Sequence, residues 1–350
     1  MRWRKAGLWN AARRKSLTDR HERIRYLDEL KGLAAFLVVL GHLVTAKQEY
    51  KGIYNFIYSF HMPLFMFVCG VTAALSFGNK GKWNYLGKRF LNIMVPYLSW
   101  CFLIPVISAL LQGGGIDWRE EFESVFVTNT AYWFLPTLYG LIVSYMLYVG
   151  IKEFVRKKAG KEGLSVQLPA WCATAALFLI LYLLTRYQLF RDMIGYMIPF
   201  SLAVLYAENS WVKGLFHKKH IILLCALCYV ALLPQFDFDH ASVGTSLRRM
   251  FLGMYMTVML LYLFADCKLP GVLRKTLAFW GKYTLLIYIL HAVMMRWSSP
   301  LEHMLTGRVM TFVWYCLLSG IICSLCCIVG MGLSHVPVVR ILCLGKGNRR

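Results

Sequence analysis

The chain has 350 residues, of which 58% are hydrophobic and only 16% are charged, and its formal net charge is +22 at pH 7. A soluble domain of this size carries roughly 25% charged residues, so the composition excludes an ordinary soluble globular protein. The positive charge would suit a nucleic-acid-binding protein, but the basic residues lie in short loops between apolar runs. That placement is typical of membrane topology, and no nucleic-acid partner is expected.

Apolar runs that are long enough, or nearly long enough, to cross a bilayer recur along the whole chain. The run at 193–207 is the least typical, because it is short and contains Pro199. The sequence predicts an all-α fold, a polytopic transmembrane bundle of about ten helices. With boundaries uncertain by ~2–4 residues, the runs lie at 30–46, 53–77, 90–111, 132–150, 169–185, 193–207, 220–234, 250–266, 277–296 and 309–331.

Lys and Arg residues alternate in number between successive loops. If the N-terminus is inside, the inner segments carry 28 of them and the outer segments carry 9. Because inner loops of membrane proteins are enriched in Lys and Arg, this bias predicts a multi-pass protein of the cell membrane with both termini cytoplasmic. We divide the chain into a basic cytoplasmic N-terminal segment (1–25), a ten-helix membrane domain (26–333) and a short basic cytoplasmic tail (334–350).

The 11 cysteines do not suggest a disulfide framework, because most of them lie inside apolar runs, where cysteine acts as a small hydrophobic residue. Cys225 and Cys228 have the CxxC spacing of some redox and metal sites. Nothing near them in the sequence completes such a site, so we expect no metal.

The first apolar run carries a lysine at its start and a histidine deep inside it. Lys31 and His42 are eleven positions apart, which on an α-helix is three turns plus about 20°, so they share one face. The same spacing separates them by about 16 Å along the helix axis. A titratable group at that depth in a membrane is a functional-site candidate, either as a general base or as an acyl acceptor. The alternative is a packing histidine that hydrogen-bonds to a neighbouring helix.

The predicted topology places the chemistry-bearing residues in two layers. The first layer, from mid-membrane to the outer half, contains three histidines: His42, His61 and His291. The second, at the cytoplasmic interface, contains three basic residues: Lys31, Lys88 and Arg89. Two such layers imply a site that is open to both sides of the membrane.

Several motifs in this order resemble the integral-membrane acyltransferase family 3, the family of bacterial O-acetyltransferases. The resemblance spans roughly residues 23–331, and no single motif decides it. The opening motif LDELKGLA (27–34) with Gly41-His42 has the family's pattern of a basic residue, ten intervening residues and a histidine. The later motifs are Phe60-His61-Met62-Pro63-Leu64-Phe65 with Gly70, Tyr85 through Lys88-Arg89 to Pro96-Tyr97, Trp133-Phe134-Leu135, and Gly281-Lys282-Tyr283-Thr284-Leu285 through Tyr288 to His291.

The resemblance implies a membrane-bound O-acetyltransferase. The expected donor is acyl-CoA from the cytoplasm, in particular acetyl-CoA, with its phosphates bound by Lys31, Lys88 and Arg89. The expected catalytic residues are His42, Lys31 and His61, and the expected acceptor is a hydroxyl group of a cell-surface glycan or lipid-linked sugar, as in polysaccharide modification of the cell envelope. The chain departs from the family at Asn92 and Val95, where an Arg and an Ile are expected; this weakens one phosphate contact.

Simpler interpretations of the same residues remain open. Lys88 and Arg89 also fit ordinary positive-inside anchors at a helix start. His61 with Pro63 also fits a helix kink with a satisfied histidine. His291 also fits a packing role, Trp133 an interfacial aromatic residue, and Asp28 a helix cap rather than a partner of Lys31.

Two other functions fit a bundle with buried histidines. The first is a transporter or flippase that moves a sugar or lipid without acyl-transfer chemistry. Such proteins often carry paired, interrupted spans in corresponding halves, and this sequence shows no such pairing. The second is a membrane-bound acyltransferase of another architecture that also uses a deep histidine.

Overall fold

The computed structural model describes residues 25–45, 47–78, 81–112, 114–128, 132–160, 162–240, 242–295 and 307–345. Within these ranges the chain forms helices and connecting turns without any strand, so the all-α prediction is confirmed. The expected N-terminal segment (1–25) lies outside the described residues except for Arg25, and so do residues 346–350 of the expected tail.

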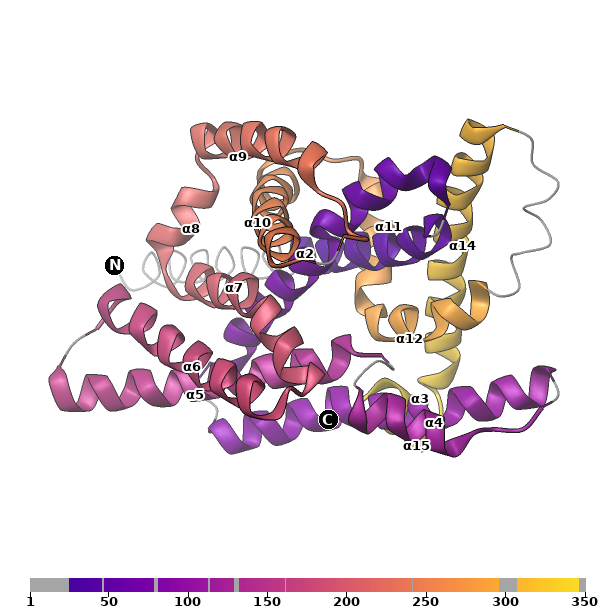
Figure 1. Cartoon of the computed structure of the whole chain (residues 1–350), viewed down its shortest axis with the longest axis horizontal. Coiled ribbons are helices and arrows are strands. Elements are labelled where there is room, and N and C mark those ends of the chain that lie inside the picture. Colours follow the sequence, from indigo (N-terminus) through magenta and orange to yellow (C-terminus); the bar gives the residue numbers. More distant parts are fainter. Residues whose placement is uncertain are drawn as a thin grey trace, which may run out of the picture.

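The described helices follow one another with short connections (Figure 1). Residues 25–44 are helical and are called here the 25–44 helix. The long helices are α2 (Lys51–Phe77), α3 (Lys82–Gln112), α5 (Phe134–Ala159), α6 (Leu164–Thr185), α7 (Gln188–Glu208), α10 (Val243–Asp266) and α14 (Arg308–Leu333). The shorter ones are η1 (Gln48–Tyr50), α4 (Trp118–Phe122), η2 (Glu123–Val127), α8 (Ser210–Phe216), α9 (Lys219–Leu232), η3 (Leu233–Gln235), α11 (Gly271–Lys282), α12 (Thr284–Met295) and α15 (Pro337–Leu344).

Many of these helices are long and apolar enough to cross a membrane. Among the described residues, seven pass this test by length and composition, and two bent pairs bring the total to nine if each pair is one span. The 25–44 helix is not among them, because Asp28, Glu29 and Lys31 lie in its first two turns. A multi-pass helical bundle is therefore confirmed, whereas the total of ten and the cytoplasmic placement of both termini stay predictions.

Two segments differ from their expected form. The span expected at 277–296 contains a sharp bend: α11 and α12 meet at an angle of 86°. The run expected at 193–207 belongs to α7, a helix of 21 residues that tolerates Pro199 in its interior. The apolar run is therefore shorter than α7, because the helix also includes the more polar residues that precede the run.

Helix α2 lies at the centre of the bundle, with α7 and α10 beside it (Figure 1). Two glycines let these helices approach closely. An added Cβ on Gly70 of α2 would lie 2.8 Å from the Phe200 carbonyl oxygen of α7, and one on Gly253 of α10 would lie 2.4 Å from the Pro63 Cβ. Since small residues are what allows membrane helices to pack backbone to backbone, these contacts hold α2 in place.

A second pair of glycines joins the 25–44 helix to α11. An added Cβ on Gly32 would lie 1.9 Å from the Leu277 carbonyl oxygen. On the other helix, an added Cβ on Gly281 would lie 1.9 Å from the Asp28 carbonyl oxygen. The backbones therefore touch at this crossing, and only glycine fits at either position.

The segment expected as a basic tail (334–350) packs against the membrane domain as far as it is described. Its helix α15 lies along α3, and the Trp100 Nε1 donates a hydrogen bond to the Cys343 carbonyl oxygen at 3.0 Å. Gly345 ends α15 with a φ of 61°, and an added Cβ there would lie 2.3 Å from the Asn92 carbonyl oxygen. Residues 337–345 thus pack against α3.

The Gly281 crossing predicts a stability loss on its substitution. Gly281→Ala places a methyl group against the Asp28 carbonyl and forces the two helices apart, which should lower the unfolding free energy by about 1–3 kcal/mol. The measurement is the thermal midpoint of the detergent-solubilised protein. Gly271→Ala is the matched control on α11, because its added Cβ meets nothing within 4 Å. Equal midpoints for the two variants would contradict the crossing.

Candidate active site

A cavity of about 370 Å³, called here the basic cavity, opens where the 25–44 helix meets α11. Three cations line it: Lys31, Arg89 and Lys282. Asp28 is the only carboxylate among its described lining residues. Its other walls come from α2, α5, α12 and the end of α15. A cavity with three cations and one acid is suited to a polyanionic ligand.

The three cations differ in how they are held. Lys31 Nζ lies 3.5 Å from Asp28 Oδ1, one turn earlier on the same helix. The Arg89 guanidinium donates to Ser76 Oγ and lies 5.1 Å from the centre of the Tyr85 ring. Neither Arg89 nor Lys282 has a carboxylate partner in the part of the chain that the structure describes. Their charge is therefore available to a ligand.

Lys88 and Asn92 lie on the same helix as Arg89 but in different settings. The Lys88 side chain is exposed and does not line the basic cavity, whereas Asn92 does. In the orientation that satisfies its hydrogen bonds, the Asn92 amide nitrogen donates to the carbonyl oxygens of Lys88 (3.1 Å) and Gly345 (2.7 Å). Asn92, which stands where an arginine was expected, thus links the end of α15 to α3 by hydrogen bonds.

A second cavity, of about 690 Å³, contains all three histidines and is called here the histidine cavity. His42 reaches it from the 25–44 helix, His61 from α2 and His291 from α12. The His42 and His291 rings lie 5.1 Å apart between centroids. The Tyr58 ring lies between His42 (6.5 Å) and His61 (4.8 Å). The three histidines expected in one layer therefore meet in one cavity.

The three histidines differ in their hydrogen bonds. The Nδ1 of His61 lies 2.8 Å from the Ile57 carbonyl oxygen, and the Nδ1 of His291 lies 3.0 Å from the Ile287 carbonyl oxygen. A carbonyl only accepts, so both Nδ1 atoms carry the hydrogen and each neutral ring keeps a lone pair at Nε2. His42 is exposed to the cavity and has no hydrogen-bond partner among the described residues. Both of its ring nitrogens are therefore available for chemistry.

The remaining wall of the histidine cavity includes aromatic rings and one cation, Arg249. The Arg249 guanidinium lies over the rings of Tyr196 (5.4 Å) and Phe238 (5.6 Å), and Trp133 stacks on Tyr196 at 5.6 Å. None of the described lining residues of this cavity is an acid. Flat aromatic faces beside one donor-rich cation are suited to a ligand with apolar ring faces and several oxygen acceptors.

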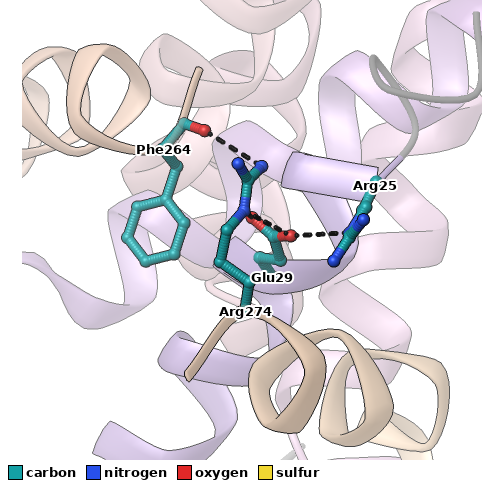
Figure 2. Close-up of polar contacts among 4 residues, drawn as sticks. All are labelled: Arg25, Glu29, Phe264 and Arg274. Carbon is teal, nitrogen blue, oxygen red and sulfur yellow. Dashed lines mark hydrogen bonds and ion pairs between the residues drawn. The ribbon is translucent and has the colours of Figure 1, made fainter. Parts of the chain in front are cut away.

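The 25–44 helix is fixed in position by a buried ion cluster (Figure 2). Glu29 is 0% exposed, and both of its carboxylate oxygens accept from Arg274 Nε of α11 at 2.9 Å. Arg25 Nε also donates to Glu29 Oε1 at 3.1 Å, and Arg274 donates onward to the Phe264 carbonyl oxygen at 3.4 Å. Because Glu29 is two residues before Lys31, this cluster holds the lysine at the basic cavity.

The two cavities share one residue, Tyr288 of α12, which lines both. Of the predicted site residues, Lys31 and Arg89 line the basic cavity and His42 and His61 the histidine cavity, while Lys88 lines neither. His291 and Trp133, whose roles were open, line the histidine cavity.

Sequence reasoning assigned no role to Arg249 or to the Glu29–Arg274 pair, and it named Lys282 only as part of a motif. Arg249 directly precedes the apolar run at 250–266, and Lys282 lies in the first turns of the run at 277–296. A cation in such a place suggests a topology anchor. The one available signal for the ion cluster was Glu29, a carboxylate directly before the apolar run at 30–46, since such a group needs a partner where the helix enters the membrane.

Comparisons of the sequence with protein families and with known proteins both found matches. The model of a family described as "Acyltransferase domain" matches residues 24–331. Nodulation protein NolL of Sinorhizobium fredii is 31% identical over 135 residues, which are 34% of each chain. NolL of Mesorhizobium japonicum is 24% identical over 220 residues, which are 59% of this chain and 54% of the relative. The chain thus spans at most about half the length of these curated relatives. No solved structure matches.

The ion cluster predicts that Arg274→Gln destabilises the protein, because it leaves the buried Glu29 carboxylate with only Arg25, which is half exposed. Removing one partner of a buried ion pair costs about 3 kcal/mol. The thermal midpoint should fall for Arg274→Gln and stay unchanged for Lys275→Gln, an exposed neighbour on the same helix that loses the same charge. The double variant Glu29→Gln/Arg274→Gln should regain part of the loss, and a larger loss in the double variant would contradict the pairing.

Proposed function

Because this chain belongs to the integral-membrane acyltransferase family 3, whose model covers residues 24–331, we propose that it transfers an acyl group from acyl-CoA to a hydroxyl group of a second substrate. One observation carries the proposal. The 25–44 helix presents Lys31 to the basic cavity at one end and an unbonded His42 to the histidine cavity at the other. A single rigid element thus links a cluster of three cations to a free imidazole.

The basic cavity is the proposed donor site. Acetyl-CoA is the proposed donor, and its phosphate groups would contact Lys31, Arg89 and Lys282, since phosphates are bound by several cationic donors at one mouth. Lys88 is exposed outside this cavity, so its proposed part is limited to attracting the donor toward it. The pantetheine arm is a long, narrow chain and extends from there along the 25–44 helix toward His42.

His42 is the proposed general base. Its imidazole takes the proton of the acceptor hydroxyl as the oxygen attacks the thioester carbon, the carbon–sulfur bond breaks, and the imidazolium returns the proton to the leaving CoA thiolate. The products are the ester and free CoA. In the variant mechanism the imidazole attacks the thioester first and carries the acyl group transiently. Holding both substrates against one imidazole supplies the proximity that the reaction needs.

The other residues of the histidine cavity support this step. The Nδ1 of His291 is committed to the backbone, so its Nε2 is available to accept a hydrogen bond from protonated His42. His61 is held in the same way, and we propose that it contacts the acceptor. The aromatic wall and Arg249 would bind a sugar, with the rings against its apolar faces and the guanidinium on its oxygens. The proposed acceptor is a cell-surface glycan or lipid-linked sugar at the cell membrane.

The free imidazole predicts that His42→Ala lowers the transfer rate by about 10²–10⁴-fold, the range for loss of a general base. The assay follows radiolabel from acetyl-CoA into the cell-envelope fraction of membranes that carry the protein. His220→Ala is the matched control, because His220 is exposed on α9 and lines neither cavity. Substantial residual transfer by His42→Ala, at an equal amount of folded protein, removes His42 from the mechanism.

The basic cavity predicts unequal effects for two adjacent cations. Arg89→Gln should raise the apparent KM for acetyl-CoA by roughly tenfold, the loss for one charge-assisted contact of about 1.4 kcal/mol. Lys88→Gln should raise it less, since Lys88 does not line the cavity. Steady-state kinetics at saturating acceptor measure both values. Equal increases in KM for the two variants would favour the sequence-based expectation that both residues bind phosphate. An unchanged KM for both variants would indicate that both residues only anchor the membrane topology.

A further inference from the structure

The wall between the basic cavity and the histidine cavity is built of aromatic rings in contact. The Phe65 ring of α2 lies 4.9 Å from the Phe134 ring of α5, and Phe134 lies 5.3 Å from the Tyr288 ring of α12. Tyr132 continues the series on the side of the histidine cavity, at 6.2 Å from Tyr288. Three helices therefore contribute one ring each to a single layer.

This wall is only about one helical turn thick. On α12, Leu285 lines the basic cavity, Tyr288 lines both and His291 lines the histidine cavity, at intervals of three residues, or about 4.5 Å along the axis. On α2, Met62 lines the histidine cavity and Phe65 the basic cavity at the same interval. One layer of side chains thus separates the two compartments.

Tyr288 is the most exposed of these three helix-borne rings. Phe65 and Phe134 are 6% and 3% exposed, so the packing around them holds their rings in place. Tyr288 is half-buried and borders open space on both sides. Its hydroxyl accepts one long hydrogen bond, from the Phe134 amide at 3.3 Å. That amide belongs to the first residue of α5, where a backbone N–H has no partner within its own helix.

We propose that Tyr288 is a movable partition that closes the passage between the two cavities, and that its displacement admits the acyl end of the pantetheine arm while setting how large an acyl group passes. The closed ring keeps water of the histidine cavity away from the thioester until it moves. The identity of what passes rests on the proposed function. The partition itself does not, because it follows from the two cavities and the wall between them.

Cys69 offers a test that needs no enzyme activity. It lines the basic cavity, does not line the histidine cavity, and is half-buried with a free thiol. A small, membrane-impermeant anionic methanethiosulfonate is added either outside intact cells or to inverted membrane vesicles, and modification of the Cys69 peptide is followed by mass spectrometry. The unmodified protein should be labelled from one side only, and Tyr288→Ala from both.

Two variants make this labelling specific. Tyr288→Phe keeps the ring and loses only the hydroxyl, so labelling of Cys69 should stay one-sided. Tyr255→Ala removes a half-buried tyrosine of α10 that lines neither cavity, and its labelling should stay one-sided. Two-sided labelling of the unmodified protein, one-sided labelling of Tyr288→Ala, or two-sided labelling of Tyr255→Ala would each overturn the proposal.

A second measurement tests what passes the partition. Without acceptor, Tyr288→Ala should hydrolyse acetyl-CoA to acetate and free CoA severalfold faster than the unmodified protein, and it should extend this activity to butyryl-CoA. Release of CoA is measured for both donors. An unchanged preference for acetyl over butyryl would overturn the size-setting role. No transfer of radiolabel from acetyl-CoA to the cell-envelope fraction, together with two-sided Cys69 labelling of Tyr288→Ala, would leave the partition standing and contradict the proposed function instead.

Discussion

The backbone contact between the 25–44 helix and α11 is the constraint on which the rest of the site depends. Gly32 and Gly281 leave no room for a side chain at this crossing, and the buried Glu29–Arg274 pair prevents the two helices from sliding. The contact brings Lys31 of one helix and Lys282 of the other to the same cavity. Because an α-helix is stiff over its length, fixing one end of the 25–44 helix also fixes His42 three turns further on.

The site consists of two cavities that are lined by different kinds of side chain. One collects positive charge and has the character of a polyanion site, whereas the other collects three imidazoles, aromatic rings and a single guanidinium. Two of the imidazoles are tied to carbonyl oxygens of their own helices, and these bonds fix their tautomers. Only the third is free among the described residues. A donor that arrives from one side and an acceptor from the other would therefore meet at His42 and not in solution.

Much of this could be predicted from the sequence, because it depends on local periodicity. Apolar runs indicated the helices, and the spacing of Lys31 and His42 placed them on one face of one helix. The rest depends on contacts between distant parts of the chain. No local pattern predicts the 86° bend between α11 and α12, or that the partner of Glu29 is Arg274, 245 positions away. Which histidine lacks a hydrogen-bond partner depends on the orientation of its ring. Arg89 lines the basic cavity and its neighbour Lys88 does not, because successive residues of a helix point 100° apart.

A structure of the protein with a non-hydrolysable acetyl-CoA analogue tests the central claim most directly. The account predicts phosphate oxygens within hydrogen-bonding distance of Lys31, Arg89 and Lys282, with the arm passing the aromatic wall and the carbonyl carbon beside the His42 ring. An analogue bound with its phosphates away from these three cations, or with its carbonyl group remote from His42, would contradict it.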